Sequence, residues 1–227
     1  MPDADEVGVR AIPELVIFDC DGVLVDSEPI SNGVLAALLS AEGMPTTLTE
    51  ARRAYQGLML SEVLTRAEAA LGHPLPEGWL ACFERERAAA FRRELRPVAG
   101  AREAVQRIKM AGVPVCVASQ GKLAKTELSL QLTGLDDLFP AGTRFSAYSV
   151  SRGKPAPDLF LHAARTMGAE AARCVVVEDT PSGVRAAGSA GMPALGYAAD
   201  SDERALSDAG AEIVHSLEEL PRLLGLG

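Results

Sequence analysis

The chain has 227 residues, of which 48% are hydrophobic, 23% charged and 4% aromatic. This composition is typical of a folded globular protein with a substantial core, and it excludes a disordered, fibrous or membrane-embedded chain. The 22 Lys and Arg against 31 Asp and Glu give a net charge of −9, which argues against nucleic acid as a partner, because phosphate backbones need a basic surface.

The chain begins with a short acidic stretch, residues 1–13, which we expect to be a flexible tail. It lacks the basic and apolar regions of a secretory signal, and no apolar run approaches the ~20 residues that span a bilayer. The four cysteines show no paired spacing and are expected to be reduced core residues. We therefore expect a cytoplasmic protein without membrane partners, a monomer or weak oligomer.

Short apolar runs bounded by turn residues predict strands that are buried on both faces, as in a parallel sheet. They lie at residues 14–18, 113–118, 174–177 and 193–196. Amphipathic stretches of helical length lie at 100–110, 123–132, 158–167 and 182–190. This alternation predicts a Rossmann-like α/β fold, an open parallel sheet with right-handed crossovers.

The interval between residues 29 and 95 breaks the alternation. It contains candidate helices at 31–39, 49–55, 60–71 and 79–95 and no convincing strand. We predict that residues 29–95 form a helical cap domain, inserted into a core domain made of residues 14–28 and 96–227.

Two acidic residues, Asp19 and Asp21, come directly after the first predicted strand, with Gly22 behind them. The carboxyl ends of parallel strands form the ligand crevice of an open α/β sheet. In an extended chain, residues two apart point to the same side, so two carboxylates there would need a cation or a shared proton. The alternative is that these acids only start a turn or cap the next helix.

A second acidic pair, Glu178 and Asp179, follows the strand at 174–177. If this strand lies beside the first, both pairs converge on one site with oxygen ligands, which Mg²⁺ prefers. Helix capping is the alternative here too, and we accept it for Thr180. We also expect Asp26 or Ser27 to cap the helix that follows them, because a proline stands in its first turn.

Two further segments could hold a phosphate. Ser119 and Gln120 follow the strand at 113–118 and could supply a hydroxyl and backbone N–H donors at a helix start. Lys154 lies between residues that stiffen the chain, Pro155 and its neighbours, with Asp158 expected to cap the next helix. The alternatives are an ordinary N-cap serine and a solvated surface lysine.

The order of these motifs resembles the four-motif signature of the haloacid dehalogenase (HAD) superfamily. The motifs are Asp-x-Asp-Gly-x-Leu-x-Asp from residue 19, Ser119 after a strand, Lys-Pro-x-Pro-Asp from 154 and Glu-Asp-Thr-x-x-Gly from 178. The chain is most similar to the branch that contains β-phosphoglucomutase, phosphoglycolate phosphatase and small phosphosugar phosphatases. The predicted helical insertion resembles the type-1 cap of that branch.

The resemblance implies an enzyme in which Asp19 attacks phosphorus to form an aspartyl-phosphate and Asp21 is the general acid and base. It implies Mg²⁺ as cofactor, held by the Asp19 carboxylate, the Asp21 backbone carbonyl and Asp179, with Glu178 a ligand or a partner of the ligands. The implied phosphate-binding residues are Gly22, Ser119, Gln120 and Lys154.

The same resemblance favours a phosphatase acting on a small phosphorylated metabolite, a phosphosugar or phosphorylated sugar acid. β-Phosphoglucomutases carry a histidine at the hinge, where this chain has Ser31, and an arginine after the glycine that matches Gly57, whereas residues 57–61 contain no basic residue. The alternatives are a phosphosugar mutase and a non-catalytic phosphometabolite-binding protein. The intact Asp-x-Asp argues against a dehalogenase, and Cys116 stands where a P-loop kinase needs glycine.

Overall fold

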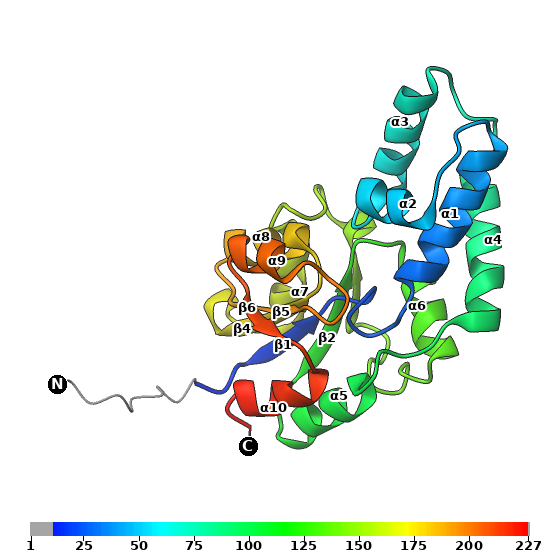
Figure 1. Ribbon diagram of the computed structural model, residues 1–227. Coiled ribbons are helices and arrows are strands. Elements are labelled where there is room, and N and C mark those ends of the chain that lie inside the picture. Colours follow the sequence, from blue (N-terminus) through cyan, green and yellow to red (C-terminus); the bar gives the residue numbers. More distant parts are fainter. Residues whose placement is uncertain (1–10, 227) are drawn as a thin grey trace.

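The computed structural model describes residues 11–226 and confirms the predicted α/β fold (Figure 1). Six parallel strands form one sheet in the order β3-β2-β1-β4-β5-β6. The strands are β1 (Leu15–Phe18), β2 (Val115–Ser119), β3 (Arg144–Ser146), β4 (Cys174–Glu178), β5 (Ala194–Tyr197) and β6 (Glu212–Val214). Most of the predicted flexible tail, residues 1–13, lies outside the described residues.

The four predicted strands are confirmed to within two residues at their ends. The strand predicted to begin at residue 113 begins at Val115, because Pro114 has no N–H to donate to the ladder. The sequence prediction missed β3 and β6, the two edge strands. Each has only three residues and is partly exposed, so neither shows a continuous apolar run.

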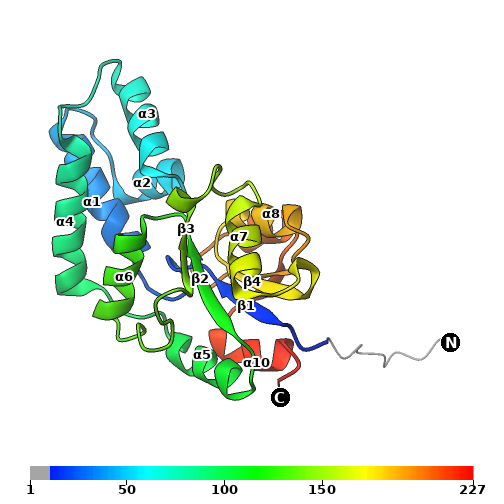
Figure 2. The same cartoon turned by 180° about the vertical axis from the view of Figure 1, so that it is seen from behind.

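Helices cover both faces of the sheet (Figures 1 and 2). Residues of β1 alternate between the faces, so Val16 and Phe18 lie in one core cluster and Leu15 and Ile17 in the other. Side chains of α5, α6 and α10 join the first cluster, and side chains of α7, α8 and α9 join the second. Their bounds are α5 (Ala101–Met110), α6 (Leu123–Leu132), α7 (Asp158–Met167), α8 (Pro181–Ser189), α9 (Glu203–Asp208) and α10 (Leu220–Leu223), with short 3₁₀ turns η1 (Ala147–Ser149), η2 (Ala171–Arg173) and η3 (Leu217–Glu219).

A separate group of four helices, called the cap helices below, follows β1. These are α1 (Glu28–Ala41), α2 (Leu48–Tyr55), α3 (Leu60–Leu71) and α4 (Trp79–Glu94), and Figure 2 shows them standing to one side of the sheet. They bury a cluster of their own around Leu39, Ala51 and Phe83, distinct from the two clusters of the sheet. The cap helices therefore hold together through their own contacts and can present side chains to the sheet edge.

Two sequence expectations about the whole chain can be compared with the described residues. Cys20, Cys116 and Cys174 are buried and Cys82 is half-buried, all as free thiols, as expected for core cysteines. Within residues 11–226, every helix is too short or too polar to cross a bilayer.

The same substitution should have opposite effects on stability at two glycines. At Gly196 in β5, an added Cβ would lie 2.8 Å from the Ala211 Cβ, so Gly196→Ala should lower the free energy of unfolding by about 1–3 kcal/mol. At Gly188 in α8, a Cβ would meet nothing within 4 Å, and Gly188→Ala should raise it by about 0.5–1 kcal/mol. Urea denaturation measures both values, and a stabilising Gly196→Ala would contradict the packing described for β5.

Candidate active site

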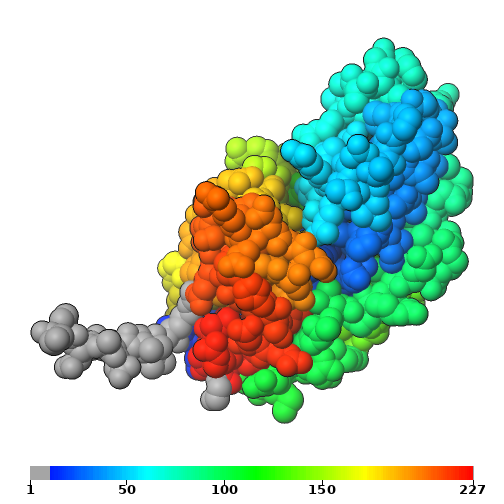
Figure 3. Space-filling model, viewed as in Figure 1, coloured from blue at the N-terminus to red at the C-terminus, as the bar shows by residue number. Residues whose placement is uncertain are grey.

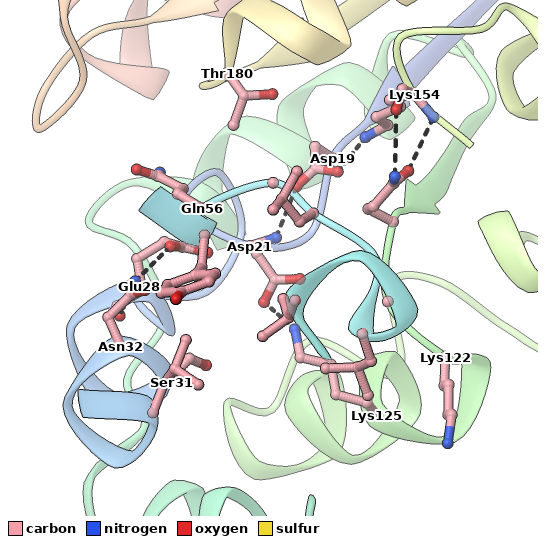
Figure 4. A pocket seen from close by; sticks show the side chains of 18 of the residues that line it. Asp19, Asp21, Glu28, Ser31, Asn32, Gln56, Lys122, Lys125, Lys154 and Thr180 are labelled. Atoms are coloured by element: carbon pink, nitrogen blue, oxygen red, sulfur yellow. Dashed lines mark hydrogen bonds and ion pairs between the residues drawn. The ribbon is translucent and has the colours of Figure 1, made fainter. Parts of the chain in front are cut away.

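A pocket lies where the carboxyl ends of the central strands face the cap helices. It encloses about 880 Å³ of space, part of it open to solvent, and its walls come from both the cap helices and the core. Figure 3 shows the cap helices, coloured from blue through cyan to blue-green, lying against the core. The acidic residues predicted from the sequence and Lys154 all line this pocket (Figure 4).

Asp19 is the first residue after β1, and only 6% of it is exposed. One carboxylate oxygen, Oδ1, accepts a hydrogen bond from Nζ of Lys154, and the other, Oδ2, accepts one from the Asp21 backbone N–H at 2.8 Å. Burial raises the pKa of the Asp19 carboxyl to about 7, although Lys154 opposes this shift. The side chain is therefore held in one orientation at the floor of the pocket.

Asp21 has different partners from Asp19. Its carboxylate is bound by Lys125 Nζ and the Ser27 hydroxyl, and the Ser119 hydroxyl lies 3.4 Å from Oδ2. The expectation that both acids share one side rested on an extended chain, but β1 ends at Phe18 and the chain turns at Gly22, with φ 77°. Burial raises the pKa of Asp21, but the charges of Lys125 and Arg87 and the hydrogen bonds from Lys125 and Ser27 together outweigh this effect, so the pKa is lowered overall.

Lys154 is buried among carboxylates, which excludes the alternative of a solvated surface lysine. Its Nζ contacts Asp19 and donates hydrogen bonds to Glu178 Oε1 at 2.6 Å and to the Ala118 carbonyl at 3.0 Å. Burial lowers the pKa of Lys154, but the Asp19 and Glu178 carboxylates raise it further, well above its usual range. The Gln120 side chain makes two hydrogen bonds to the backbone of Lys154. Its carbonyl oxygen accepts one from the Lys154 N–H at 3.0 Å, and its amide nitrogen donates one to the Lys154 carbonyl at 3.3 Å.

Glu178 and Asp179 are adjacent but differ in how their carboxylates are used. Glu178 binds Lys154 with one oxygen, and its other oxygen accepts from the Thr180 N–H and hydroxyl, each at 2.8 Å. Asp179 is 4% exposed, and its Oδ2 is 3.4 Å from Gln56 Nε2. Its Oδ1 has no hydrogen-bond partner within residues 11–226. Burial, with the nearby charges of Glu178 and Asp19, raises the pKa of Asp179 well above its usual value.

Mg²⁺ fits this arrangement of charges. Asp19, Glu178 and Asp179 are three buried carboxylates around one buried lysine, and the orphaned Oδ1 of Asp179 lacks the partner that a buried oxygen needs. The backbone passes so close to Asp179 that a Cβ at Gly22 would lie 2.2 Å from its Oδ2.

The four acidic residues expected at the metal site differ in whether other side chains already bind their carboxylates. Within residues 11–226, no three His, Cys, Asp or Glu side chains form a ready metal cluster. Asp21 is held by Lys125, and Glu178 by Lys154 and Thr180. Of these four residues, only Asp179 keeps a carboxylate oxygen without a partner in the described part of the chain, whereas both oxygens of Asp19 accept one hydrogen bond each and face the same pocket. Two carboxylates placed in this way would suit Mg²⁺, because it commonly binds one or two carboxylates and keeps several waters.

Several capping expectations have mixed outcomes. Thr180 caps α8 as predicted, its hydroxyl accepting from the Gly183 N–H at 3.1 Å. Ser27 precedes α1 but makes no capping bond, because its hydroxyl binds Asp21 instead. Ser119 is the last residue of β2 and lies before the cap position of α6, so the N-cap alternative is wrong for it. Asp158 begins α7 without capping it, since its carboxylate accepts from Arg152.

The sequence prediction missed Lys125, Gln56 and Ser27 as neighbours of the acidic residues. Lys125 lies in the first turn of α6, and only its short distance along the chain from Ser119 could have drawn attention to it. Gln56 ends α2 in the cap helices, and its contact with Asp179 spans 123 residues of sequence. No local pattern reports such a contact.

Similarities to one family model and to three known proteins bear on this site. A family model for haloacid dehalogenase-like hydrolases matches residues 13–191. The chain is 29% identical over 211 residues to the 6-phosphogluconate phosphatase of Escherichia coli, covering 92% of this chain and 94% of that protein. It is also 29% identical over 214 residues to a phosphorylated carbohydrates phosphatase of Thermotoga maritima, covering 93% and 98%. A crystal structure of a HAD family hydrolase from Deinococcus radiodurans, with bound phosphate and sodium, superposes with a TM-score of 0.78 and 32% identity, covering 95% of this chain and 98% of that chain.

Replacing Asp179 by Asn should stabilise the metal-free protein at pH 8. A carboxyl whose pKa rises on folding destabilises the folded state as the pH increases, and an amide removes this effect, which is worth about 1.4 kcal/mol per unit of pKa. Thermal unfolding in a chelator should show a higher melting temperature for Asp179→Asn than for the wild type. The exposed Asp208→Asn serves as the control. A lower melting temperature for Asp179→Asn than for the wild type would contradict the excess of buried negative charge at Asp179.

Proposed function

Because the chain belongs to the haloacid dehalogenase-like hydrolases, as its motifs predicted, and is a phosphatase, we propose that it hydrolyses small phosphosugars or phosphorylated sugar acids with the help of Mg²⁺. The observation that carries this proposal is the buried Asp19 carboxylate, held by Lys154 at the floor of a pocket. The named relatives act on phosphorylated carbohydrates, and the Deinococcus radiodurans structure holds a phosphate.

In the first step, an Asp19 carboxylate oxygen forms a bond to phosphorus while the bond from phosphorus to the ester oxygen breaks. The leaving oxygen takes the electron pair and a proton from Asp21, which gives the free alcohol and an aspartyl-phosphate. The Asp21–Lys125 ion pair favours the ionised carboxylate. A phosphomonoester dianion entering beside Asp21 raises the pKa of this carboxyl by charge repulsion, which favours the protonated form that this step needs.

In the second step, water attacks the phosphorus of the aspartyl-phosphate and the bond to Asp19 breaks. Asp21 takes the proton of the attacking water, and inorganic phosphate and the Asp19 carboxylate are released. The Ser27 and Ser119 hydroxyls and Lys125 orient Asp21 for both proton transfers.

Lys154 and Ser119 are proposed to hold the phosphoryl oxygens. Glu178 is proposed to position Lys154 rather than to bind the metal directly. Gln120 positions the backbone of Lys154. Mg²⁺, bound by the carboxylates of Asp19 and Asp179 and the Asp21 carbonyl, would offset the repulsion between the nucleophile and an anionic substrate.

Hydrolysis is favoured over a mutase reaction by the residues at the hinge and in the segment that leads from α2 into the start of α3. A mutase must hold a second phosphate, but Gly57, Leu58 and Leu60 line the pocket with no basic side chain among them. Ser31, at the hinge position, is also an uncharged residue of the pocket lining. These residues are suited to a neutral part of a substrate.

Replacing Asp19 by Asn should lower phosphate release from phosphosugars by more than about 1,000-fold, because the nucleophile is lost. Asp21→Asn should be severely impaired as well, because the proton donor is lost. Both variants should keep the wild-type circular dichroism spectrum, and the exposed Asp208→Asn should keep full activity. Turnover by Asp19→Asn at the wild-type rate would remove the assignment of the nucleophile.

Chelation should abolish activity and Mg²⁺ should restore it, because two buried carboxylates are proposed to share the ion. The measurement is phosphate release after dialysis against EDTA, followed by titration with MgCl₂. Full activity in EDTA would contradict the proposed cofactor while leaving the role of Asp19 open to the test above.

A further inference from the structure

Among the described residues, one cation in the pocket lacks a hydrogen-bond or ion-pair partner. The cationic side chains that line the pocket are Arg87, Lys122, Lys125 and Lys154. Lys154 is paired with Asp19 and Glu178, Lys125 with Asp21, and Lys122 with Glu84 at 2.6 Å. Within residues 11–226, the guanidinium of Arg87 makes neither a hydrogen bond nor an ion pair.

Arg87 lies on the face of α4 that is turned toward the acidic residues. Phe83, Arg87 and Phe91 follow one another at four-residue spacing, so they share one face of the helix. The guanidinium carbon of Arg87 lies 4.8 Å from the centre of the Phe83 ring, and Nζ of Lys125 lies 5.6 Å from the Phe91 ring. Since Lys125 holds Asp21, this face adjoins the side of the site from which the alcohol leaves.

The acidic groups near Arg87 are all engaged elsewhere. Asp21, Glu84 and Glu28 favour its charged form, but burial outweighs them and lowers the pKa of Arg87. Glu84 binds Lys122, Asp21 binds Lys125, and Glu28 accepts a hydrogen bond from Asn32 at 2.9 Å. A partly desolvated guanidinium stacked on an aromatic ring, with five unused donors, is poised to bind an anion that the protein itself does not supply.

We propose that Arg87 binds a carboxylate at the end of the substrate remote from the phosphoryl group, so that the enzyme selects phosphorylated sugar acids over the corresponding neutral phosphosugars. This inference rests on the proposed function, since it places the phosphoryl group at Asp19 and the leaving alcohol at Asp21.

A carboxylate suits the position better than a second phosphate does. The planar fork of arginine matches a carboxylate through two parallel hydrogen bonds. A phosphate carries up to two charges, yet Arg87 is the one unpaired cation among the described pocket residues, and Glu28 and Asp21 stand close to it. Ser31, Asn32 and Gln56 line the same pocket with neutral polar groups, which suit the hydroxyls of a sugar chain.

A matched pair of substrates tests the inference. 6-Phosphogluconate and glucitol 6-phosphate have the same open carbon chain and differ at the far end, where the first has a carboxylate and the second a hydroxymethyl group. The wild type should show a kcat/KM for the acid at least about 10-fold above that for the alditol. Arg87→Gln should lose about 10- to 100-fold for the acid and change by less than about threefold for the alditol, with Arg87→Lys in between.

The matched control is Arg85→Gln. Arg85 lies two residues away on the same helix, but its side chain is 68% exposed and paired with Glu86, so this variant should retain the preference for the acid. Equal losses on both substrates in Arg87→Gln, or no loss on either, would overturn the proposal and leave the phosphatase assignment intact. A preference for fructose 1,6-bisphosphate over both probes, abolished by Arg87→Gln, would overturn it in favour of a second phosphate.

Binding gives a readout that is independent of turnover. In the Asp19→Asn background, calorimetric titration should show that 6-phosphogluconate binds more tightly than glucitol 6-phosphate, and that adding Arg87→Gln removes the difference. Equal binding of the two probes before the second change would overturn the proposal. Failure of the wild type to release phosphate from either probe or from a broad panel of phosphomonoesters would instead overturn the proposed function itself.

Discussion

The organisation of the site depends on a shortage of positive charge at one edge of the sheet. Three buried carboxylates, Asp19, Glu178 and Asp179, meet a single buried lysine, Lys154. Both carboxylate oxygens of Glu178 accept hydrogen bonds from the protein, and these bonds hold Lys154 and Thr180 in place. A divalent cation could compensate the remaining negative charge of Asp19 and Asp179. The position of these two carboxylates therefore sets where a cation and an anionic substrate could bind side by side.

The core and the cap helices divide the work of binding between them. The strand ends supply the groups that are proposed to face phosphorus, and each of these is hydrogen-bonded to the backbone or to a neighbouring buried charge. The cap helices supply Gln56, which reaches Asp179, and the unpaired Arg87. The core would then carry out the reaction, and the side chains of the cap helices would select which class of phosphorylated substrate binds.

The fold was predictable wherever burial leaves a local trace. Continuous apolar runs marked β1, β2, β4 and β5, because strands in the middle of a parallel sheet are covered on both faces. β3 and β6 escaped prediction because edge strands of three residues bury too little to show such a run. Ser27 was expected to cap a helix, since the sequence shows its position before Pro29 but not the carboxylate that takes up its hydroxyl.

The sequence by itself determined the chemical type of this protein: ordered acidic, hydroxyl and lysine residues after apolar strands, and from them the hydrolase family. Tertiary structure decided which of those acids remain available. Lys125 neutralises Asp21 and Lys154 engages Glu178, while Asp179 keeps an unpartnered oxygen. Among the described residues it also left Arg87 without an ion pair, while the other pocket cations are paired. Residue type is local information, whereas the pairing of charges depends on distances between segments that only the folded chain brings together.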